Sequence, residues 1–322
     1  GTLVVKQAIC TILVFCAHGH FATARADDTP SQRQEEQSSQ ADLQGGYLGI
    51  LLVPYGMNYR KAAVGVNFHY KIPLVKSNHI LWKDTNLTFG ISEDYVFVNN
   101  NVGGFVEITP IALFKLRVHA GYDYFIRRPF DGGIQALTMG GLNALRTDRL
   151  EKDDPTSIDW VNGLENTNIF QAAKNGGGLR LKISPSLQGK LGPIGVQYTF
   201  TADFNHYKLD GLSEQDIFYD STSFTMKKLT DWGFLHEMKL MYFLEIPKNQ
   251  LIVGLYASYY SARSNDLKRL ETYVLAVYVP SWEVLGRWKP WAAVQLGTHL
   301  IDPMHRYDFT WVIALGADVR LF

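Results

Sequence analysis

The chain has 322 residues, and its 31 Lys and Arg balance its 31 Asp and Glu. This balance gives no overall positive charge that would point to nucleic acid as a partner. The length allows one large domain or two small ones, and the 13% of aromatic residues is a composition that suits membrane interfaces.

The first 26 residues have the pattern of an export signal. Lys6 supplies a positive charge, residues 8–17 form an apolar run, and Ala24-Arg25-Ala26 provides a cleavage site of small residues. The run is too short for a membrane-spanning helix. We therefore predict that residues 1–26 are a cleaved signal peptide; a buried N-terminal helix and a lipoprotein signal are the alternatives.

Both cysteines, Cys10 and Cys16, lie inside this segment. The mature chain would then have no thiol for catalysis or for a cysteine-based metal site, which suits an oxidising compartment. Residues 27–44 are polar and rich in Gln and Ser, so we predict a flexible periplasmic linker.

Residues 45–322 contain repeated alternation of apolar and polar residues with a period of two, which predicts β-strands. The clearest case is 114–126, where Phe114, Val118 and Tyr122 share one face while Lys115 and His119 share the other. About twelve such segments occur, with predicted spans 46–55, 61–72, 85–98, 103–109, 113–126, 177–188, 194–208, 232–246, 250–262, 270–279, 289–300 and 307–321.

The predicted connections fall into two sets on alternate sides. One set is mostly short and contains Pro in every member, whereas the other includes the long segments 127–176 and 209–231. Short turns on one side and long loops on the other are typical of transmembrane barrels. The pattern also places aromatics near strand ends, as interface girdles require: Trp232, Tyr242, Tyr273, Trp288 and Tyr307. We predict an all-β fold, a closed antiparallel transmembrane β-barrel of about twelve strands with long extracellular loops; a soluble sandwich or lipocalin-like barrel is the alternative.

In these patterns, and in its terminal aromatic Phe322, the chain resembles the bacterial outer-membrane β-barrel class. The resemblance implies a location in the outer membrane of a Gram-negative bacterium, contact with outer-membrane lipid, and folding by the barrel-assembly machinery. The last apolar series ends on Leu321 rather than on Phe322. We therefore expect either a bulge in the last strand or a strand that ends before Phe322.

The polar faces of the strands would line the barrel interior, and function is expected there. Basic residues dominate one predicted wall and acids lie mainly elsewhere, which favours a narrow passive channel (a porin) for small solutes, with a preference for anions. The candidate lining and solute-binding residues are Lys71, Lys115, Arg117, His119, Arg180, Lys182, Asp203, Glu237 and Lys239.

Two other functions stay open. The charges can pair and plug the lumen, which would leave a structural or interaction barrel that binds a protein partner through 127–176. A barrel-embedded lipid or peptide hydrolase is the third hypothesis, but the best candidate base, His119, has no nucleophile beside it on its own strand. We therefore predict no enzyme, no cofactor and no metal; His299, Asp302 and His305 would hold a cation only weakly.

Overall fold

The computed structural model describes the chain in fifteen stretches that begin at residue 45. They are 45–57, 63–75, 77, 79, 81–82, 84–96, 99–125, 134–137, 170–214, 216–220, 225–246, 249–265, 268–281, 288–302 and 309–321. The predicted signal peptide (1–26), the linker (27–44) and Phe322 lie outside these residues, as does most of the segment 127–176.

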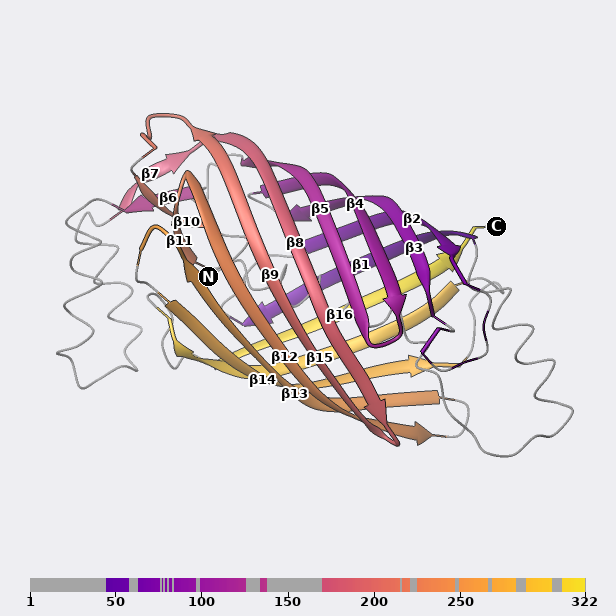
Figure 1. The fold of residues 1–322 in the computed structure, drawn as a ribbon. Coiled ribbons are helices and arrows are strands. Elements are labelled where there is room, and N and C mark those ends of the chain that lie inside the picture. The colour runs from indigo at the N-terminus through magenta and orange to yellow at the C-terminus, as the bar shows by residue number, and fades with distance from the viewer. Residues whose placement is uncertain are drawn as a thin grey trace, which may run out of the picture.

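Twelve antiparallel strands form a closed barrel, because the first strand pairs with the last (Figure 1). They are β1 (Gly45–Met57), β2 (Ala63–Pro73), β3 (Asn86–Val96), β4 (Asn99–Ile111), β5 (Phe114–Phe125), β8 (Gly176–Leu191), β9 (Ile194–Leu209), β12 (Thr230–Ile246), β13 (Asn249–Ala262), β14 (Lys268–Pro280), β15 (Trp288–Ile301) and β16 (Phe309–Arg320). The predicted fold class and strand number are confirmed.

The strands have 11 to 17 residues. A strand needs only about 9–11 residues to cross a bilayer, so the longer ones extend the barrel wall beyond a membrane. The last strand ends at Arg320 and pairs with β15 without a shift in register, so the predicted bulge is not found there. An irregularity instead lies in β1, between Leu52 and Tyr55.

The two ends of the barrel differ in their connections. One end, the turn end, carries the links 74–85, 112–113, 192–193, 247–248 and 281–287. The opposite end, the loop end, carries 58–62, 97–98, 126–175, 210–229, 263–267 and 302–308. This sorting agrees with the pattern expected from the sequence.

The two longest links at the loop end contain strands that the sequence did not predict. They are β6 (Ile134–Leu137), β7 (Phe170–Lys174), β10 (Ile217–Asp220) and β11 (Thr225–Lys228), and they pair in the order β11-β10-β6-β7. This small sheet lies at the loop end, on the left in Figure 1.

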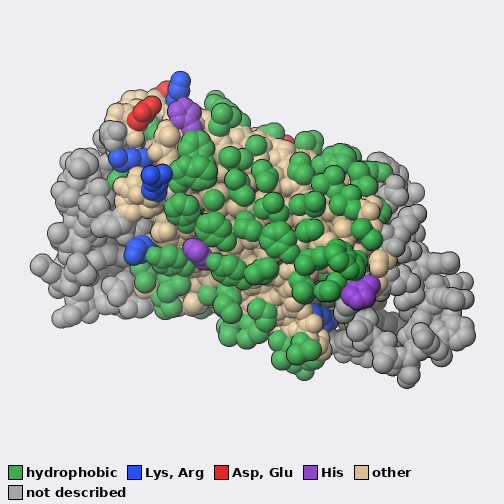
Figure 2. Space-filling view, in the orientation of Figure 1, with side chains coloured by type: hydrophobic (Ala, Val, Ile, Leu, Met, Phe, Trp, Pro, Cys, Tyr) green, Lys and Arg blue, Asp and Glu red, His purple; other side chains and the backbone are tan. Residues whose placement is uncertain are grey.

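The outward face of the barrel is apolar. Side chains such as Ile91, Tyr122 and Leu179 are largely exposed, and Figure 2 shows a broad hydrophobic surface over the strands. A soluble protein rarely exposes so large an apolar surface, so this exterior is suited to lipid. Among the residues that the structure describes, no helix is long and apolar enough to cross a membrane.

The predicted aromatic girdle is partly correct. Tyr242 is exposed on the exterior, and Trp232 shares that outward face, where its ring contacts Phe204 at 5.0 Å. Tyr273 instead points inward and is 3% exposed, so its assignment to the girdle is wrong. The reason is that β14 is apolar on both faces from Tyr273 to its end, so this part of the strand gives no clear alternation.

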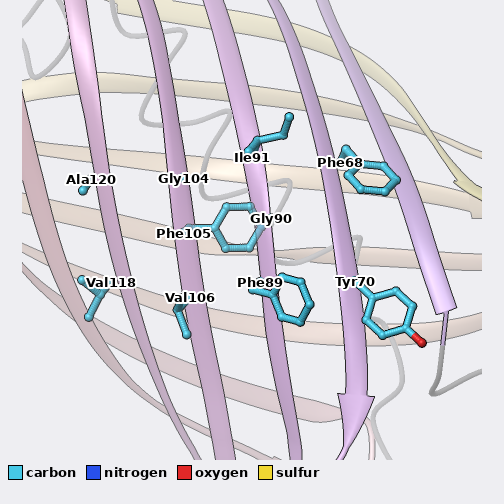
Figure 3. Close-up of a pocket in the computed structure, with 10 residues that line it drawn as sticks. All are labelled: Phe68, Tyr70, Phe89, Gly90, Ile91, Gly104, Phe105, Val106, Val118 and Ala120. Carbon is cyan, nitrogen blue, oxygen red and sulfur yellow. The ribbon is translucent and has the colours of Figure 1, made fainter.

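A shallow depression on this exterior runs across β2 to β5 (Figure 3). It forms where Gly104 and Ala120 stand among the larger side chains of Phe68, Phe89 and Ile91. Its lining is mostly apolar, with the Tyr70 hydroxyl as its polar group, and it opens outward, so it belongs to the lipid-facing surface.

Candidate functional site

The barrel interior has two unlike halves. On β2, β5 and β8 the inward side chains of Lys71, Arg117, Lys182 and Ser184 are only partly buried. On β12 to β16 the inward side chains are packed, as Tyr260 at 0% and Val312 at 1% exposure show. Solvent-accessible interior surface among the described residues therefore gathers on the β2–β8 side.

Large interior side chains lie along the wall, because glycines on neighbouring strands make room for them. A Cβ atom at Gly103 would come within 2.7 Å of Nε2 of His119, and one at Gly316 within 2.2 Å of the Trp291 ring. Each ring thus occupies the space of a missing side chain. This arrangement keeps the two rings from projecting across the lumen.

The accessible half carries an excess of positive charge. The carboxylate of Glu107 forms ion pairs with two cations, Lys115 at 3.4 Å and Arg117 at 3.9 Å. Lys71 and Lys182 form no ion pair with any described residue. The four cations on this wall thus outnumber the one carboxylate that two of them contact, and Asp84 and Asp203 are the further acids within electrostatic reach of Lys71 and Lys182.

Arg117 is the most accessible of the ion-paired cations in this group. Its side chain is 26% exposed, and its guanidinium lies 3.9 Å from the centre of the Phe105 ring. Such a cation–π contact holds a guanidinium in place while leaving its edge free to meet an anion.

Arg180 does not belong to this basic group, contrary to the sequence prediction of one basic wall. Its Nε and Nη2 donate to the two carboxylate oxygens of Asp203, at 2.7 and 2.5 Å. Its Nη1 lies 3.4 Å from Asp123, which also accepts hydrogen bonds from Asn101 and Tyr207. Arg180 is thus neutralised by acids on β5 and β9, which lie on either side of β8.

The β10–β11 hairpin adds two charged side chains, Asp220 and Lys227, to this group at the loop end. Lys227 lies 2.6 Å from Asp220 and 3.4 Å from Asp203, and Asp220 lies 3.6 Å from Arg180. The five groups Asp123, Arg180, Asp203, Asp220 and Lys227 form what we call the loop-end cluster, and every side chain in it is at most 4% exposed.

Apolar contacts fix the same hairpin. Phe218 is fully buried among Phe125, Tyr207, Leu209 and Leu229. Its ring meets that of Tyr207 edge-on at 5.8 Å. Because Phe125 and Tyr207 point inward from the barrel wall, the hairpin is docked on interior-facing side chains at one end of the lumen.

The remaining predicted residues, Glu237 and Lys239, lie on the packed half. Glu237 accepts a hydrogen bond from the Tyr256 hydroxyl at 2.8 Å, and Lys239 donates to Gln197 at 3.4 Å. Both are at most 8% exposed, so they are less accessible than Arg117. Their role in solute binding stays a prediction.

The sequence prediction missed a second buried network on β14 and β15. Glu271 contacts Arg269 at 3.3 Å, His299 at 3.6 Å and the Ser258 hydroxyl at 2.7 Å. The inward positions of β14 carry Arg269, Glu271 and Tyr273 in alternation; the predicted strand 270–279 included Glu271 and Tyr273 but began one residue after Arg269. No group of three His, Cys, Asp or Glu within the described residues is arranged to hold a metal ion.

His119 has a neighbour that its own strand did not reveal. Its Nε2 lies 3.2 Å from the hydroxyl of Ser92 on β3, since Gly103 lets the ring reach across β4. A serine and a histidine alone do not make a hydrolytic site, because the histidine must also be oriented by a third group. Nδ1 of His119 has no hydrogen-bond partner among the described residues.

No protein-family model matches the chain, and no curated protein matches it in sequence. Among solved structures it is similar to the NanC porin, with 9% identity, a TM-score of 0.40, and 85% of this chain and 100% of that one covered. It is also similar to the β-domain of the Bordetella autotransporter BrkA (8% identity, TM-score 0.44, 87% and 100% covered) and to the KdgM porin (8%, 0.38, 86% and 99%). The fold assignment rests on this chain's own strand pairing, which closes the barrel between β1 and β16.

The interior therefore contains three arrangements with different chemistry. The basic group on β2, β5 and β8 can attract anions. In the loop-end cluster two cations contact three carboxylates, and in the network on β14 and β15 Arg269 contacts Glu271, so the charges of both are held in buried ion pairs.

Proposed function

We propose that the protein is a bacterial outer-membrane barrel that acts as a narrow passive channel for small solutes, with a preference for anions. The observation that carries the proposal is the interior basic group on β2, β5 and β8. In it Lys115 and Arg117 share the carboxylate of Glu107, while the partly buried Lys71 and Lys182 form no ion pair with a described residue. Uncompensated charge of one sign inside a low-dielectric wall raises the local concentration of oppositely charged solutes.

The location follows from the exterior. A closed barrel leaves no unpaired strand edges, and an apolar outer face suits the hydrocarbon region of a bilayer. Short turns on one side and long loops on the other are the arrangement of bacterial outer-membrane barrels. In the proposed orientation the turn end lies in the periplasm and the loop end faces outward.

A second function, a closed barrel that binds a partner, is favoured by the docked hairpin. The β10–β11 hairpin places Phe218 and Lys227 against interior-facing residues at the loop end. A hairpin held there narrows that end of the lumen, and the small sheet that contains it would then be the binding surface.

Conductance in a planar bilayer separates the two functions. We expect discrete current steps from the purified full chain and a reversal potential that shows anion preference under a salt gradient. A chain that gives no current at any voltage or salt concentration would contradict the channel and favour the closed barrel.

The double variant Arg117→Glu/Lys182→Glu tests the basic group itself. It reverses two interior charges, so selectivity should move towards cations. Lys208→Glu/Lys268→Glu makes the same charge change on exposed exterior positions and is the matched control. Equal selectivity of the interior variant and the unmodified protein would show that these residues do not set selectivity.

A further inference from the structure

The exterior of β9, β12 and β13 carries a dense group of aromatic side chains towards the loop end. The rings of Phe200 and Phe234 are stacked at 6.2 Å, and those of Phe204 and Trp232 meet at 5.0 Å. Next to them, His236 accepts or donates a hydrogen bond with the Tyr198 hydroxyl at 2.8 Å. Aromatic side chains with polar edges prefer the boundary between hydrocarbon and headgroups, so this group marks the membrane boundary on this side of the barrel.

Basic residues follow immediately beyond these aromatics. Lys208 lies on β9, four residues beyond Phe204 in the direction of the loop end, and it is exposed. The backbone N–H of the exposed Arg263 donates to the carbonyl of Trp232 at 2.8 Å. Lys268 is exposed and pairs with Ser261, the residue that also pairs with Phe234.

We call Lys208, Arg263 and Lys268 the basic rim. None of the three forms an ion pair with a described residue. The exposed acids Asp210 and Glu214 lie in the connection beyond the end of β9. Figure 2 shows Lys and Arg side chains gathered at the loop end of this face, beside the hydrophobic surface.

Among the residues that the structure describes, the exposed exterior cations near the loop end lie on the β9–β14 side of the barrel. On the opposite side, the exterior position of β3 near the loop end is the exposed Glu93, which accepts a hydrogen bond from Asn100.

The order along the strands, apolar then aromatic then basic, is also the order of a lipid leaflet, from acyl chains through the interface to the phosphates. We propose that the basic rim, with the aromatic group below it, is a binding site for the phosphate headgroups of anionic lipids in the leaflet at the loop end. The cations attract the phosphates, while the aromatics and the apolar wall receive the rest of the lipid.

The site is tested by competition between two lipids. The full chain is purified in neutral detergent and offered equal amounts of phosphatidylglycerol and phosphatidylcholine, and the retained lipids are counted by native mass spectrometry. We expect the unmodified protein to prefer phosphatidylglycerol. The preference should fall about fivefold for each rim cation that is removed, in line with about 1 kcal/mol per basic residue near an anionic surface.

Lys208→Gln/Arg263→Gln/Lys268→Gln is the test variant, and Lys190→Gln/Lys289→Gln, at the turn end, is the control. Loss of the preference in the first variant and its retention in the second would support the site. Equal retention of both lipids by the unmodified protein, or an unchanged preference in the rim variant, would overturn it.

The salt dependence of the lipid preference can be measured on the unmodified protein, so this test does not depend on whether a variant folds. If the rim binds phosphates by charge, raising the salt concentration to about 1 M should weaken the preference, since the screening length falls to about 3 Å. A preference that is independent of salt would also overturn the proposal.

Discussion

Replacing Lys227 by Met should release the β10–β11 hairpin from the barrel interior. The ammonium lies 2.6 Å from Asp220 and 3.4 Å from Asp203, and its side chain is 0% exposed. Its loss leaves Arg180 as the only cation among three carboxylates in the loop-end cluster. Removing one partner of a buried ion pair costs about 3–5 kcal/mol, because the other partner stays buried without compensation.

The cost should appear as local opening, because the barrel itself is held by twelve paired strands. A loss of about 3–5 kcal/mol corresponds to an increase of about a hundredfold to a few thousandfold in the population of the undocked hairpin. Hydrogen exchange of the backbone amides of β10 and β11, measured in lipid nanodiscs, reports this population directly. Amides of β9 should keep their protection.

Two further variants make the reasoning testable. Asp220→Asn/Lys227→Met removes one charge of each sign and should recover much of the protection, since replacing both partners is far less costly than removing one. Lys208→Met removes an exposed lysine at the same end and should leave exchange unchanged. If Lys227→Met exchanges as slowly as the unmodified protein, the cluster does not hold the hairpin.

Three other results are expected. Burial disfavours the charged form of Lys227, but the negative charges of Asp203 and Asp220 outweigh this effect and raise its pKa above the usual 10.5. The contribution of Lys227 to hairpin docking should therefore be constant from neutral pH to 10.5 and weaken only above that value. Hydrogen exchange of β10 and β11, corrected for the intrinsic effect of pH, would contradict this if protection were lost at a lower pH. Gly103→Ala should destabilise the folded barrel by about 1–3 kcal/mol, because its Cβ would lie 2.6 Å from a backbone oxygen. Gly104→Ala should be tolerated, because the nearest atom to its Cβ would be 3.6 Å away. Equal stability of the two variants in a urea titration in vesicles would show that this difference in space does not matter. Ile91→Arg places a charge on an exterior position whose side chain is 62% exposed. Near the bilayer centre such a charge should lower the folding stability by about 2–4 kcal/mol in the same titration. A variant as stable as the unmodified protein would show that this face does not contact lipid.

The barrel could be predicted because alternation reports directly on a wall with lipid on one side and polar groups on the other. The span predicted at 194–208 agrees with Ile194–Leu209 in the structure. The four-residue strands β10 and β11 were missed because so short a segment shows no period. They depend on tertiary contacts such as that of Phe218 with Phe125, which is far away in the sequence.

Pairing of charges was less predictable than the position of the strands. The tight link at 192–193 fixes the register of β8 against β9 and places Lys182 opposite Asp203. The structure instead shows Asp203 bound by Arg180, which sits diagonally from it. Register follows from the sequence, but the choice between two cations within reach depends on side-chain conformations and on Lys227, which arrives from the hairpin.

The pairing that closes the barrel also constrains how the chain can fold. Tyr47 in the first strand is opposite Arg320 in the last, so this seam joins the two ends of the described chain. Contacts between residues so far apart form late, because a long loop must first be closed. Until β16 arrives, β1 keeps an open hydrogen-bonding edge that can pair with another chain. Truncation before residue 309 should therefore leave an open sheet that aggregates, and not a smaller barrel.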